Sequence, residues 1–267
     1  MNILITGGTG TVGTEMVRQF SKDNNITVFS RNEVHQVEMS RLFPWVKYVI
    51  GDIRSYKALK IATKGVDVIY HLAAIKHVPV CQNQPNEAIK TNVIGTMNVM
   101  KAAKRNGCAV VFLSTDKAES PSCVYGNTKA IAEHVVLDAG GIVVRSGNIF
   151  GSSGSVIPLF IEQVRAQNEL TLTDGEMTRY FISPSRLVQF MFGTSETGKV
   201  YYPPMKAFSM RMVAEECVKR YGDADTKIKY IGARHGEKKH EVSQGVSSEY
   251  VSPIEYLEEL FDIYTRV

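Results

Sequence analysis

The amino-acid sequence predicts an α/β fold in which a doubly wound parallel sheet is followed by a smaller C-terminal lobe. Short β-branched runs alternate with longer helical patterns through the first 146 residues, which is typical of strands joined by crossover helices. A glycine-rich turn connects the first run to the first helical stretch. After this region the alternation stops and loop-forming residues become frequent, so we expect a second, smaller unit there.

The predicted strands are apolar along most of their length, which indicates strands covered on both faces. Because parallel strands are joined by right-handed crossovers, we expect helices on both sides of the sheet. The strands are predicted over 3–6, 26–30, 47–50, 66–71, 109–114 and 142–145, and the helices over 11–20, 55–63, 86–106 and 124–138.

The C-terminal part begins with a loop rich in glycine and serine, at 147–154. We predict a helix over 156–167, short strands over 170–173, 199–202 and 226–231, and two further helices within 208–267. We assign 1–150, with 184–203 interleaved, to a dinucleotide-binding domain, and we assign 151–183 and 204–267 to a substrate-binding lobe.

Composition and charge exclude several classes of protein. Lysine and arginine number 31 against 27 acidic residues, and the resulting charge of +4 is spread along the chain. This pattern suits an enzyme with anionic ligands and argues against a nucleic-acid partner. The four cysteines are widely spaced without a C-x-x-C pair, so we expect no metal site and no disulfide framework. No apolar run approaches the roughly 20 residues that span a bilayer, and no signal-peptide pattern is visible. We therefore expect a cytoplasmic protein without a membrane partner.

The glycine-rich turn has the spacing G-x-x-G-x-x-G between the first predicted strand and helix. Glycine permits the tight turn, and it lets backbone N–H groups approach a pyrophosphate at the helix N-terminus. The spacing resembles that of extended short-chain dehydrogenases, which have a Rossmann fold. The alternative is a purely structural turn. We predict dinucleotide binding by Gly7, Thr9, Gly10, Thr11, Val12 and Gly13.

The end of the second strand indicates which dinucleotide binds. An acidic residue there would accept from the ribose 2′-hydroxyl of NAD, whereas an arginine suits the 2′-phosphate of NADP. Ser30 and Arg31 occupy this place and the first acid is Glu33, so NADP is favoured over NAD. The alternative for Arg31 is a solvated surface position. Further contacts with the cofactor are expected where the third and fourth strands end, from Asp52, Ile53, Leu72, Ala73 and Ala74. Asn92, Tyr125 and Lys129 are also expected to contact it.

Tyr125 and Lys129 are the predicted catalytic pair. At positions i and i+4 of a helix they share one face. A nearby ammonium and the positively charged nicotinamide favour the phenolate, so Tyr125 can accept a proton from a substrate hydroxyl as hydride leaves for the cofactor. The pattern Y-x-x-x-K often arises by chance. Here it follows the glycine turn, Asn92 and a hydroxyl neighbour, Thr115, at the end of the fifth strand.

Asp116 and Lys117 add an acid and a base at the same strand end. Once a sugar C4 hydroxyl is oxidised to a ketone, the C5 proton becomes acidic. Lys117 can remove that proton while Asp116 protonates the departing C6 hydroxyl, which amounts to loss of water. Lys117 must be neutral for part of such a cycle, a state that desolvation and nearby positive charge favour. The alternative is a surface ion pair.

Several segments resemble the inverting UDP-N-acetylglucosamine 4,6-dehydratases, a family of extended short-chain dehydrogenases in polysaccharide and pseudaminic-type sugar biosynthesis. The resemblance covers nearly the whole chain, and its most specific element is Thr115-Asp116-Lys117, since related dehydratases that act without C5 inversion have Thr-Asp-Glu. The matching segments are HLAAIKHVP (71–79), TNVIGT (91–96), STDKA (114–118), YGNTK (125–129), GSVIP (154–158), MTRYF (177–181) and GEKKHE (236–241).

The resemblance implies a hydro-lyase whose tightly bound NADP is recycled in each turnover. C4 is oxidised, water is lost across C5–C6, and hydride return to C6 with protonation of C5 from the opposite face gives a UDP-4-keto-6-deoxy-L-arabino-hexulose. It also implies a homo-oligomer, a dimer or a hexamer. Lys76 is expected beside both nicotinamide and sugar. The implied UDP-sugar contacts are Lys76, Asn148, Val156, Thr173, Met177, Arg179, Arg234 and Glu237.

The chain departs from the family at Gln82, where a glutamate is usual, and it is shorter than most relatives. Two other functions remain open. A nucleotide-sugar 4-epimerase or 4-reductase would share everything except a need for Asp116 and Lys117. A non-catalytic NADP-binding regulator would have the same fold, but it would have no reason to keep both Tyr125 and Lys129.

Overall fold

In the computed structural model, which describes residues 1–233 and 236–265, seven strands form a sheet in the order β10-β6-β5-β4-β1-β2-β3. β1 pairs in parallel with β2 and β4, β2 with β3, β4 with β5, and β10 with β6. This confirms the predicted parallel sheet. The strands are β1 (Asn2–Thr6), β2 (Asn25–Ser30), β3 (Lys47–Ile50), β4 (Val68–His71), β5 (Ala109–Thr115), β6 (Ile142–Ser146) and β10 (Val200–Tyr201).

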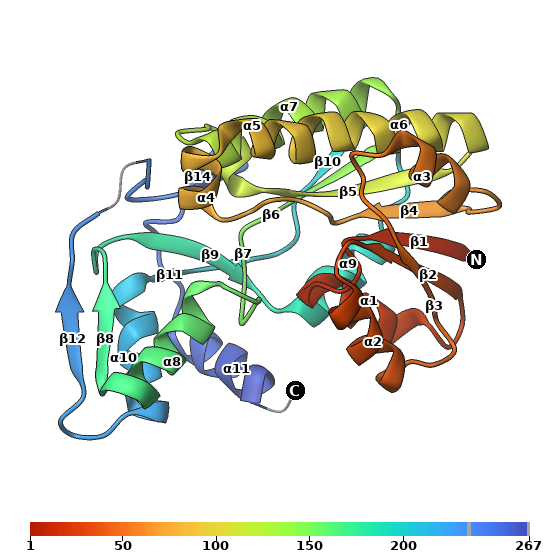
Figure 1. The fold of residues 1–267 in the computed structure, drawn as a ribbon. Coiled ribbons are helices and arrows are strands. Elements are labelled where there is room, and N and C mark those ends of the chain that lie inside the picture. Colours follow the sequence, from red (N-terminus) through yellow and green to blue (C-terminus); the bar gives the residue numbers. More distant parts are fainter. Residues whose placement is uncertain (234–235, 266–267) are drawn as a thin grey trace. The chain divides into compact units, whose positions relative to one another are not determined.

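The chain divides into two compact units. The first contains Met1–Arg145 and Ser185–Pro203, and the second contains Ser146–Pro184 and Pro204–Val267. Both are seen in Figure 1. Every helix in the described ranges is too short or too polar to cross a membrane.

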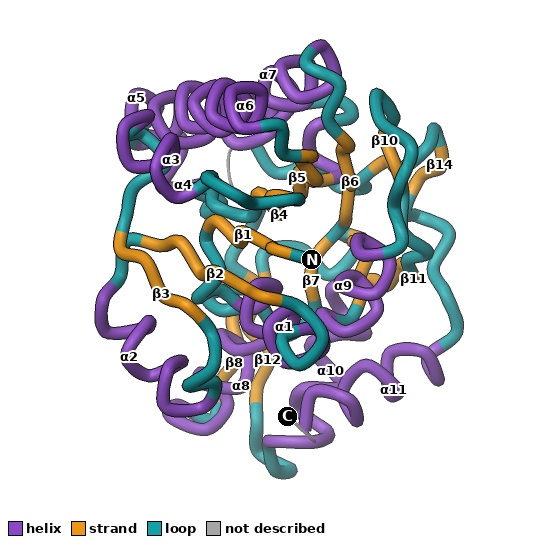
Figure 2. The backbone as a smooth tube through the Cα atoms, turned by 90° about the vertical axis from the view of Figure 1, so that its right-hand side faces the viewer, coloured by secondary structure: helices purple, strands orange, loops and turns teal. Residues whose placement is uncertain are grey.

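Helices cover both faces of the sheet in the first unit. Figure 2 shows α3, α5, α6 and α7 on one side and α1, α2 and α9 on the other. The first group packs over a core that includes Leu4, Phe29 and Phe112. On the opposite face Phe192 stacks on Phe20, with ring centroids 3.9 Å apart. The helices are α1 (Thr11–Phe20), α2 (Glu33–Leu42), α3 (Tyr56–Ala62), α4 (Val78–Asn83), α5 (Pro85–Ala88), α6 (Gly95–Asn106), α7 (Val124–Asp138) and α9 (Pro184–Phe192).

The helices differ from the sequence prediction in several places, and α4 and α9 are among those not expected. Helix α2 was not expected, because it buries only Gln36 and Met39 and therefore has little apolar periodicity. Its start is fixed instead by Asn32, whose side chain accepts a hydrogen bond from the His35 N–H. The helix expected over 86–106 is interrupted by a π-helical segment, Ile89–Ile94, between α5 and α6.

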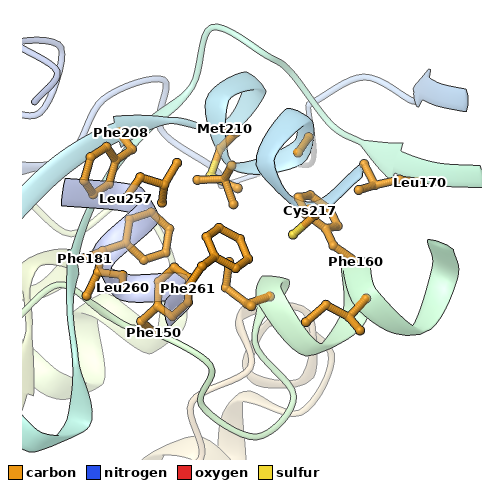
Figure 3. Packing of buried hydrophobic residues seen from close by; sticks show 14 of the residues in the cluster. Phe150, Phe160, Leu170, Phe181, Phe208, Met210, Cys217, Leu257, Leu260 and Phe261 are labelled. Atoms are coloured by element: carbon orange, nitrogen blue, oxygen red, sulfur yellow. The ribbon is translucent and has the colours of Figure 1, made fainter. Parts of the chain in front are cut away.

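The second unit has its own core, shown in Figure 3. Phe150 packs edge-on against Phe261 with ring centroids 4.8 Å apart, and Phe181 and Phe208 extend this cluster. β9 pairs antiparallel with β11 and parallel with β7, while β12 pairs with β8 and β13 with β14. The elements are β7 (Asn148–Ile149), α8 (Val156–Gln167), β8 (Glu169–Leu172), β9 (Thr178–Ile182), β11 (Lys206–Ser209), α10 (Met210–Tyr221), β12 (Lys227–Tyr230), β13 (Val242–Ser243), β14 (Val246–Ser247) and α11 (Ile254–Thr265).

A buried histidine links the two central strands of the first unit. His71 Nδ1 lies 2.7 Å from Thr6 Oγ1, and its Nε2 lies 3.0 Å from Thr96 Oγ1. Because the Thr96 hydroxyl donates its single proton to the Asn92 carbonyl, His71 Nε2 must donate to Thr96 and Nδ1 must accept from Thr6. Burial lowers the pKa of His71 to about 3, with a smaller contribution from the Lys129 charge. The ring is therefore neutral in the folded protein.

We predict that this neutral histidine makes the protein acid-sensitive. The unfolded chain binds a proton at His71 near pH 6.5 but the folded protein does not, so stability is lost as pH falls below that value. Between about pH 6.5 and about pH 5 the loss from this group is roughly 2 kcal/mol. Urea unfolding at both pH values should show a correspondingly smaller loss for His71→Gln. The matched variant His77→Gln, at an exposed histidine, should retain the wild-type loss. An unchanged loss in His71→Gln would contradict the assignment.

Candidate active site

The turn between β1 and α1 brings the backbone of two loops into close contact. Gly7 has a φ of +69°, and a Cβ atom there would lie 2.8 Å from the backbone N and Cα of Ala73. A Cβ on Gly13 would lie 2.4 Å from Gly8 Cα. Only glycine fits these places. Gly10 is the N-cap of α1, so this turn presents the positive end of a helix dipole at the carboxyl edge of the sheet.

A cavity of about 180 Å³ opens beside this turn. It collects residues from the ends of β1, β2, β3 and β4, which is the edge where such sheets bind ligands. Thr91 Oγ1 is buried at its wall and has no hydrogen-bond partner among the described residues. The cavity is lined by Gly7, Thr9, Phe29, Ser30, Arg31, Asn32, Gly51, Asp52, Ile53, Ala73, Ala74 and Thr91.

The polar groups of this cavity include both hydrogen-bond donors and an acceptor carboxylate. Gln36 Nε2 donates to Ser30 Oγ at 2.9 Å, which leaves the Ser30 hydroxyl proton to donate elsewhere. Asp52 accepts from the backbone N–H and the Nε of Arg54, and Arg31 Nη1 lies 3.9 Å from its carboxylate. Burial raises the pKa of Asp52, but the hydrogen bonds and charge of Arg54, with Arg31, hold it below its ordinary value. Two guanidinium groups thus surround one carboxylate.

The loop after β4 is fixed by Asn92, which lies in the π-helical segment. Its Oδ1 accepts from the Ile75 N–H at 2.8 Å, and its Nδ2 donates to the Ile75 carbonyl at 2.9 Å and to Thr128 Oγ1 at 3.1 Å. Asn92 therefore joins the cavity loop to helix α7. Lys76, the next residue of this loop, is exposed.

Lys129 is buried beneath the carboxyl end of β5. Its Nζ donates to the Leu113 carbonyl at 2.7 Å and lies 3.7 Å from the centroid of the Phe112 ring. Burial lowers the pKa of Lys129 to about 7, although the nearby Glu133 carboxylate opposes this shift. Its ammonium is therefore a charge that can be lost near neutral pH.

Tyr125 lies on the same helix one turn earlier and is partly exposed. Burial of its hydroxyl raises its pKa to about 12, while the Lys117 charge and a hydrogen bond with Thr115 act to lower it. The phenol is thus neutral as the structure stands, and it needs additional positive charge to act as a base.

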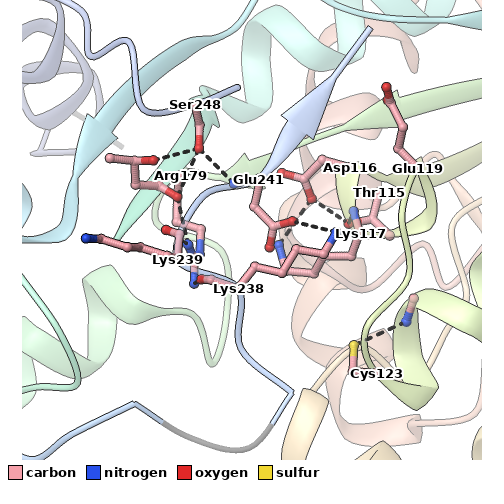
Figure 4. A network of polar contacts seen from close by, with 12 residues as sticks. Thr115, Asp116, Lys117, Glu119, Cys123, Arg179, Lys238, Lys239, Glu241 and Ser248 are labelled. Atoms are coloured by element: carbon pink, nitrogen blue, oxygen red, sulfur yellow. Dashed lines mark hydrogen bonds and ion pairs between the residues drawn. The ribbon is translucent and has the colours of Figure 1, made fainter. Parts of the chain in front are cut away.

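Asp116 and Lys117 form a close ion pair at the end of β5. Lys117 Nζ lies 3.1 Å from Asp116 Oδ1, which also accepts from Thr115 Oγ1 at 3.0 Å. The Asp116 carboxylate is fully buried, whereas the Lys117 side chain is 20% exposed. A short 3₁₀ turn, Asp116–Ala118, presents both side chains. Figure 4 shows this arrangement with Thr115. Thr115, Asp116, Lys117 and Tyr125 are therefore brought together in the first unit.

One contact of this region was not expected from the sequence. Gln82 Oε1 accepts from the Val124 N–H at 2.7 Å, so α4 caps the helix that carries Tyr125 and Lys129. From the sequence, Gln82 is distinguished only by standing where the resembled family usually has glutamate. The Gln82 amide oxygen caps the helix without placing a negative charge next to Tyr125.

The second unit contains most of the residues expected to bind the sugar nucleotide. Both Nη atoms of the buried Arg179 donate to backbone carbonyls, at 2.7 Å to Thr178, 3.2 Å to Lys239 and 2.9 Å to Lys238 (Figure 4). Arg179 therefore ties β9 to the 238–239 segment. Asn148 lies in β7, Val156 begins α8, Thr173 and Met177 flank the turn before β9, and Glu237 precedes the tied segment. Arg234 lies outside the described residues. The described chain holds no group of three acidic, His or Cys side chains able to bind a metal ion.

Comparison with known proteins identifies the family. A model described as polysaccharide biosynthesis protein matches residues 3–256. The chain belongs to this family. A protein of Rickettsia canadensis named UDP-glucose 4-epimerase is 38% identical over 282 residues, covering 98% of this chain and 82% of that protein.

Two solved structures resemble the fold closely. One is described as Pen from Bacillus thuringiensis, with a TM-score of 0.93, 29% identity and coverage of 100% of this chain and 98% of that one. Another is DesIV, a dTDP-glucose 4,6-dehydratase from Streptomyces venezuelae with NAD and TYD bound, with a TM-score of 0.81, 23% identity and coverage of 89% and 86%. The latter likeness concerns the fold alone.

Proposed function

We propose that this chain is a nucleotide-sugar-modifying enzyme of the extended short-chain dehydrogenase type that removes water from UDP-N-acetylglucosamine across C5 and C6 with inversion at C5. The family membership and the relatives named as UDP-sugar epimerases support the nucleotide-sugar substrate. The side chains gathered at the end of β5 support the dehydration.

A nicotinamide dinucleotide fits the glycine turn and the adjoining cavity. Gly7 and Gly13 let the turn pack directly against the backbone of Ala73 and Gly8. This close packing presents the N–H groups at the start of α1 to a pyrophosphate. The buried Thr91 hydroxyl at the cavity wall can form a hydrogen bond with a polar group of the bound cofactor. Bound there, the cofactor would accept a hydride from the sugar and return it later in the cycle. Arg31 and the donor hydroxyl of Ser30 favour the 2′-phosphate of NADP, because a phosphate only accepts hydrogen bonds.

Tyr125 acts on the C4 hydroxyl in this proposal. It accepts the hydroxyl proton as C4 becomes a ketone, and Thr115 orients the phenol through their hydrogen bond. The high pKa of the phenol must fall for this step. The Lys117 charge already lowers the pKa of the phenol. Lys129 adds a second cation, and burial lowers the pKa of Lys129 itself to about 7.

Asp116 and Lys117 carry out the elimination. Lys117 removes the C5 proton made acidic by the C4 ketone, and Asp116 donates a proton to the C6 hydroxyl, which leaves as water. The observation that carries the proposal is the 3.1 Å contact between Lys117 Nζ and the buried Asp116 carboxylate. Within such a pair a proton can pass from Lys117 to Asp116, which leaves the neutral amine and the protonated acid that the elimination needs.

A 4-epimerase is the second candidate. The names of the curated relatives favour it, since the Rickettsia protein is called UDP-glucose 4-epimerase. Epimerisation needs the Tyr125 base and a 4-keto sugar that can rotate in the site to present its other face to the cofactor. It does not need Asp116 and Lys117. The two reactions therefore differ in what these residues contribute.

The product mass separates the two reactions. Purified protein incubated with UDP-N-acetylglucosamine and NADP⁺ should give a sugar nucleotide lighter by one water, detected by mass spectrometry. Tyr125→Phe should abolish this product, because the phenol is the group that takes the C4 proton in this proposal. A product of unchanged mass would support the epimerase, and binding of cofactor without any turnover, unaltered by Tyr125→Phe, would support a regulator.

Replacing Lys117 should stop the elimination. In Lys117→Ala the loss of water and the exchange of the C5 proton with deuterated solvent should fall by about 10³-fold, the usual contribution of a general base, while NADP affinity stays unchanged. Lys117→Arg is the matched control, since it keeps the positive charge but does not release a proton at neutral pH. It should be as inactive as the alanine variant. Normal deuterium incorporation at C5 in either variant would refute the role of Lys117.

Replacing Arg31 should weaken NADP binding selectively. Loss of a charge-assisted contact costs about 1.5–3 kcal/mol, so the Kd for NADP should rise roughly 10- to 100-fold in Arg31→Ala while the Kd for NAD changes little. Calorimetry with each cofactor measures both values. Arg41→Ala, which removes an exposed arginine from α2, should change neither. Equal weakening of NADP and NAD by Arg31→Ala would count against 2′-phosphate recognition.

A further inference from the structure

We propose that Arg145 is a positioning residue that holds the Tyr125–Lys129 face of helix α7 in register with the Asp116–Lys117 turn. The inference rests on the proposed function, because it concerns two groups of residues that this function uses in different steps. Neither Arg145 nor its two carboxylate partners, Glu133 and Glu119, belongs to the reacting groups.

The first contact joins Arg145 to the catalytic helix. Arg145 lies in β6, and its guanidinium binds Glu133 with two hydrogen bonds, from Nε at 3.1 Å and from Nη2 at 2.5 Å. Glu133 follows Tyr125 by eight residues and Lys129 by four, so all three lie on one face of α7. A two-point contact of this kind fixes the rotation of the helix as well as its distance from the sheet.

The second contact joins the same guanidinium to the turn after β5. Arg145 Nη1 donates to Glu119 Oε2 at 3.1 Å. The backbone N–H of Glu119 in turn donates to the Asp116 carbonyl at 3.1 Å. A displacement of Glu119 is therefore transmitted directly to the residue whose side chain pairs with Lys117.

The network is sheltered from solvent, so its contacts are not weakened as surface ion pairs are. The side chains of Arg145, Glu119 and Glu133 are 12%, 16% and 4% exposed. Arg145 Nη1 also donates to Tyr202 Oη at 2.9 Å. Burial alone would lower the pKa of Arg145, but its contacts with Glu133, Tyr202 and Glu119 raise it far above its ordinary value. The cation is permanent, and only a planar fork with several donors can serve both carboxylates at once.

Glu133 has an additional electrostatic effect on the catalytic helix. Its carboxylate opposes the burial that lowers the pKa of Lys129. The two contacts of Arg145 therefore differ in their consequences. Loss of Glu133 affects the groups that act at C4, while loss of Glu119 affects the pair that acts at C5 and C6.

Three variants test this division. Glu119→Gln removes the charge from the contact with the turn. Glu133→Gln removes the charge and the two-point contact with α7, and Arg145→Lys keeps one cation while losing the fork. Glu15→Gln, which removes the partner of Arg18 on α1, is the matched control. Each variant is mixed with UDP-N-acetylglucosamine and NADP⁺ in a single turnover. Absorbance of the reduced nicotinamide reports the C4 step, and deuterium incorporation at C5 with loss of water reports the elimination.

We expect the two steps to separate. Glu119→Gln should slow the elimination by 10-fold or more, toward the roughly 10²-fold cost of a 1 Å misplacement, and should leave the C4 step within about twofold. Glu133→Gln should slow the C4 step, and the alkaline limit of that step should move down by about one pH unit because Lys129 loses its proton more easily. Arg145→Lys should impair both steps, and Glu15→Gln neither.

Equal slowing of both steps in Glu119→Gln and Glu133→Gln, or no slowing in either, would overturn the proposal. Thermal unfolding of each variant separates these results from loss of the fold, and Glu119→Gln, which spares the bidentate contact, is the variant expected to fold normally. If wild-type protein forms reduced cofactor but loses no water, the proposed dehydration fails. The pH limit of the C4 step in Glu133→Gln then still tests whether Arg145 and Glu133 position the catalytic helix.

Discussion

An ammonium group buried beneath the carboxyl edge of the sheet is the constraint on which the active-site region depends. Lowering the pKa of Lys129 from 10.5 to about 7 corresponds to roughly 5 kcal/mol of destabilisation of its charged form. This is the cost that remains after the Glu133 carboxylate has opposed the effect of burial. The Leu113 carbonyl and the face of Phe112 also contact the ammonium. Glu133 is itself buried, and it requires Arg145. One unusual charge thus explains why an ion-pair network extends from α7 through β6 to the turn after β5.

Hydrogen bonds between neutral groups organise the other half of the site. The chain from Thr6 through His71 and Thr96 to Asn92 connects the ends of β1 and β4 to the π-helical segment. Asn92 then uses its whole amide to hold Ile75 and Thr128. Because each buried donor and acceptor in this chain has a defined partner, the loop beside the cavity is fixed without any charged group.

The fold could be predicted from the sequence because its signals are local. Each strand of the parallel sheet is a short apolar run, and Gly7, Gly10 and Gly13 mark the turn that a side chain would block. Helix α2 escaped prediction because its stability comes from capping by Asn32 rather than from an apolar face. Strand β9 was read only as the motif MTRYF, although all five of its residues are buried and most are β-branched or aromatic.

The candidate site was predictable only where its residues follow strand ends or helical spacing. Asp116, Lys117, Tyr125 and Lys129 meet these conditions, and the structure places Asp116 and Lys117 in direct contact. The roles of Gln82, Gln36 and Arg145 depend on partners that are 42, 6 and 12 residues away in the chain, and nothing in their local sequence announces those partners. Arg145 looks like an ordinary polar residue near the end of a strand until its two carboxylates are seen together.

In the π-helical segment Ile89–Ile94, the number of residues determines the position of Asn92 as much as the amino-acid sequence does. Such a segment accommodates one residue more than an α-helix of the same rise. Removing a single residue there would restore regular α-helical winding and turn Asn92 by about 100° relative to α6. Its amide would then face away from Ile75 and Thr128, although every side chain of the active site would still be present in the sequence. The number of residues in this stretch is thus as much a condition for the site as the identity of Asn92.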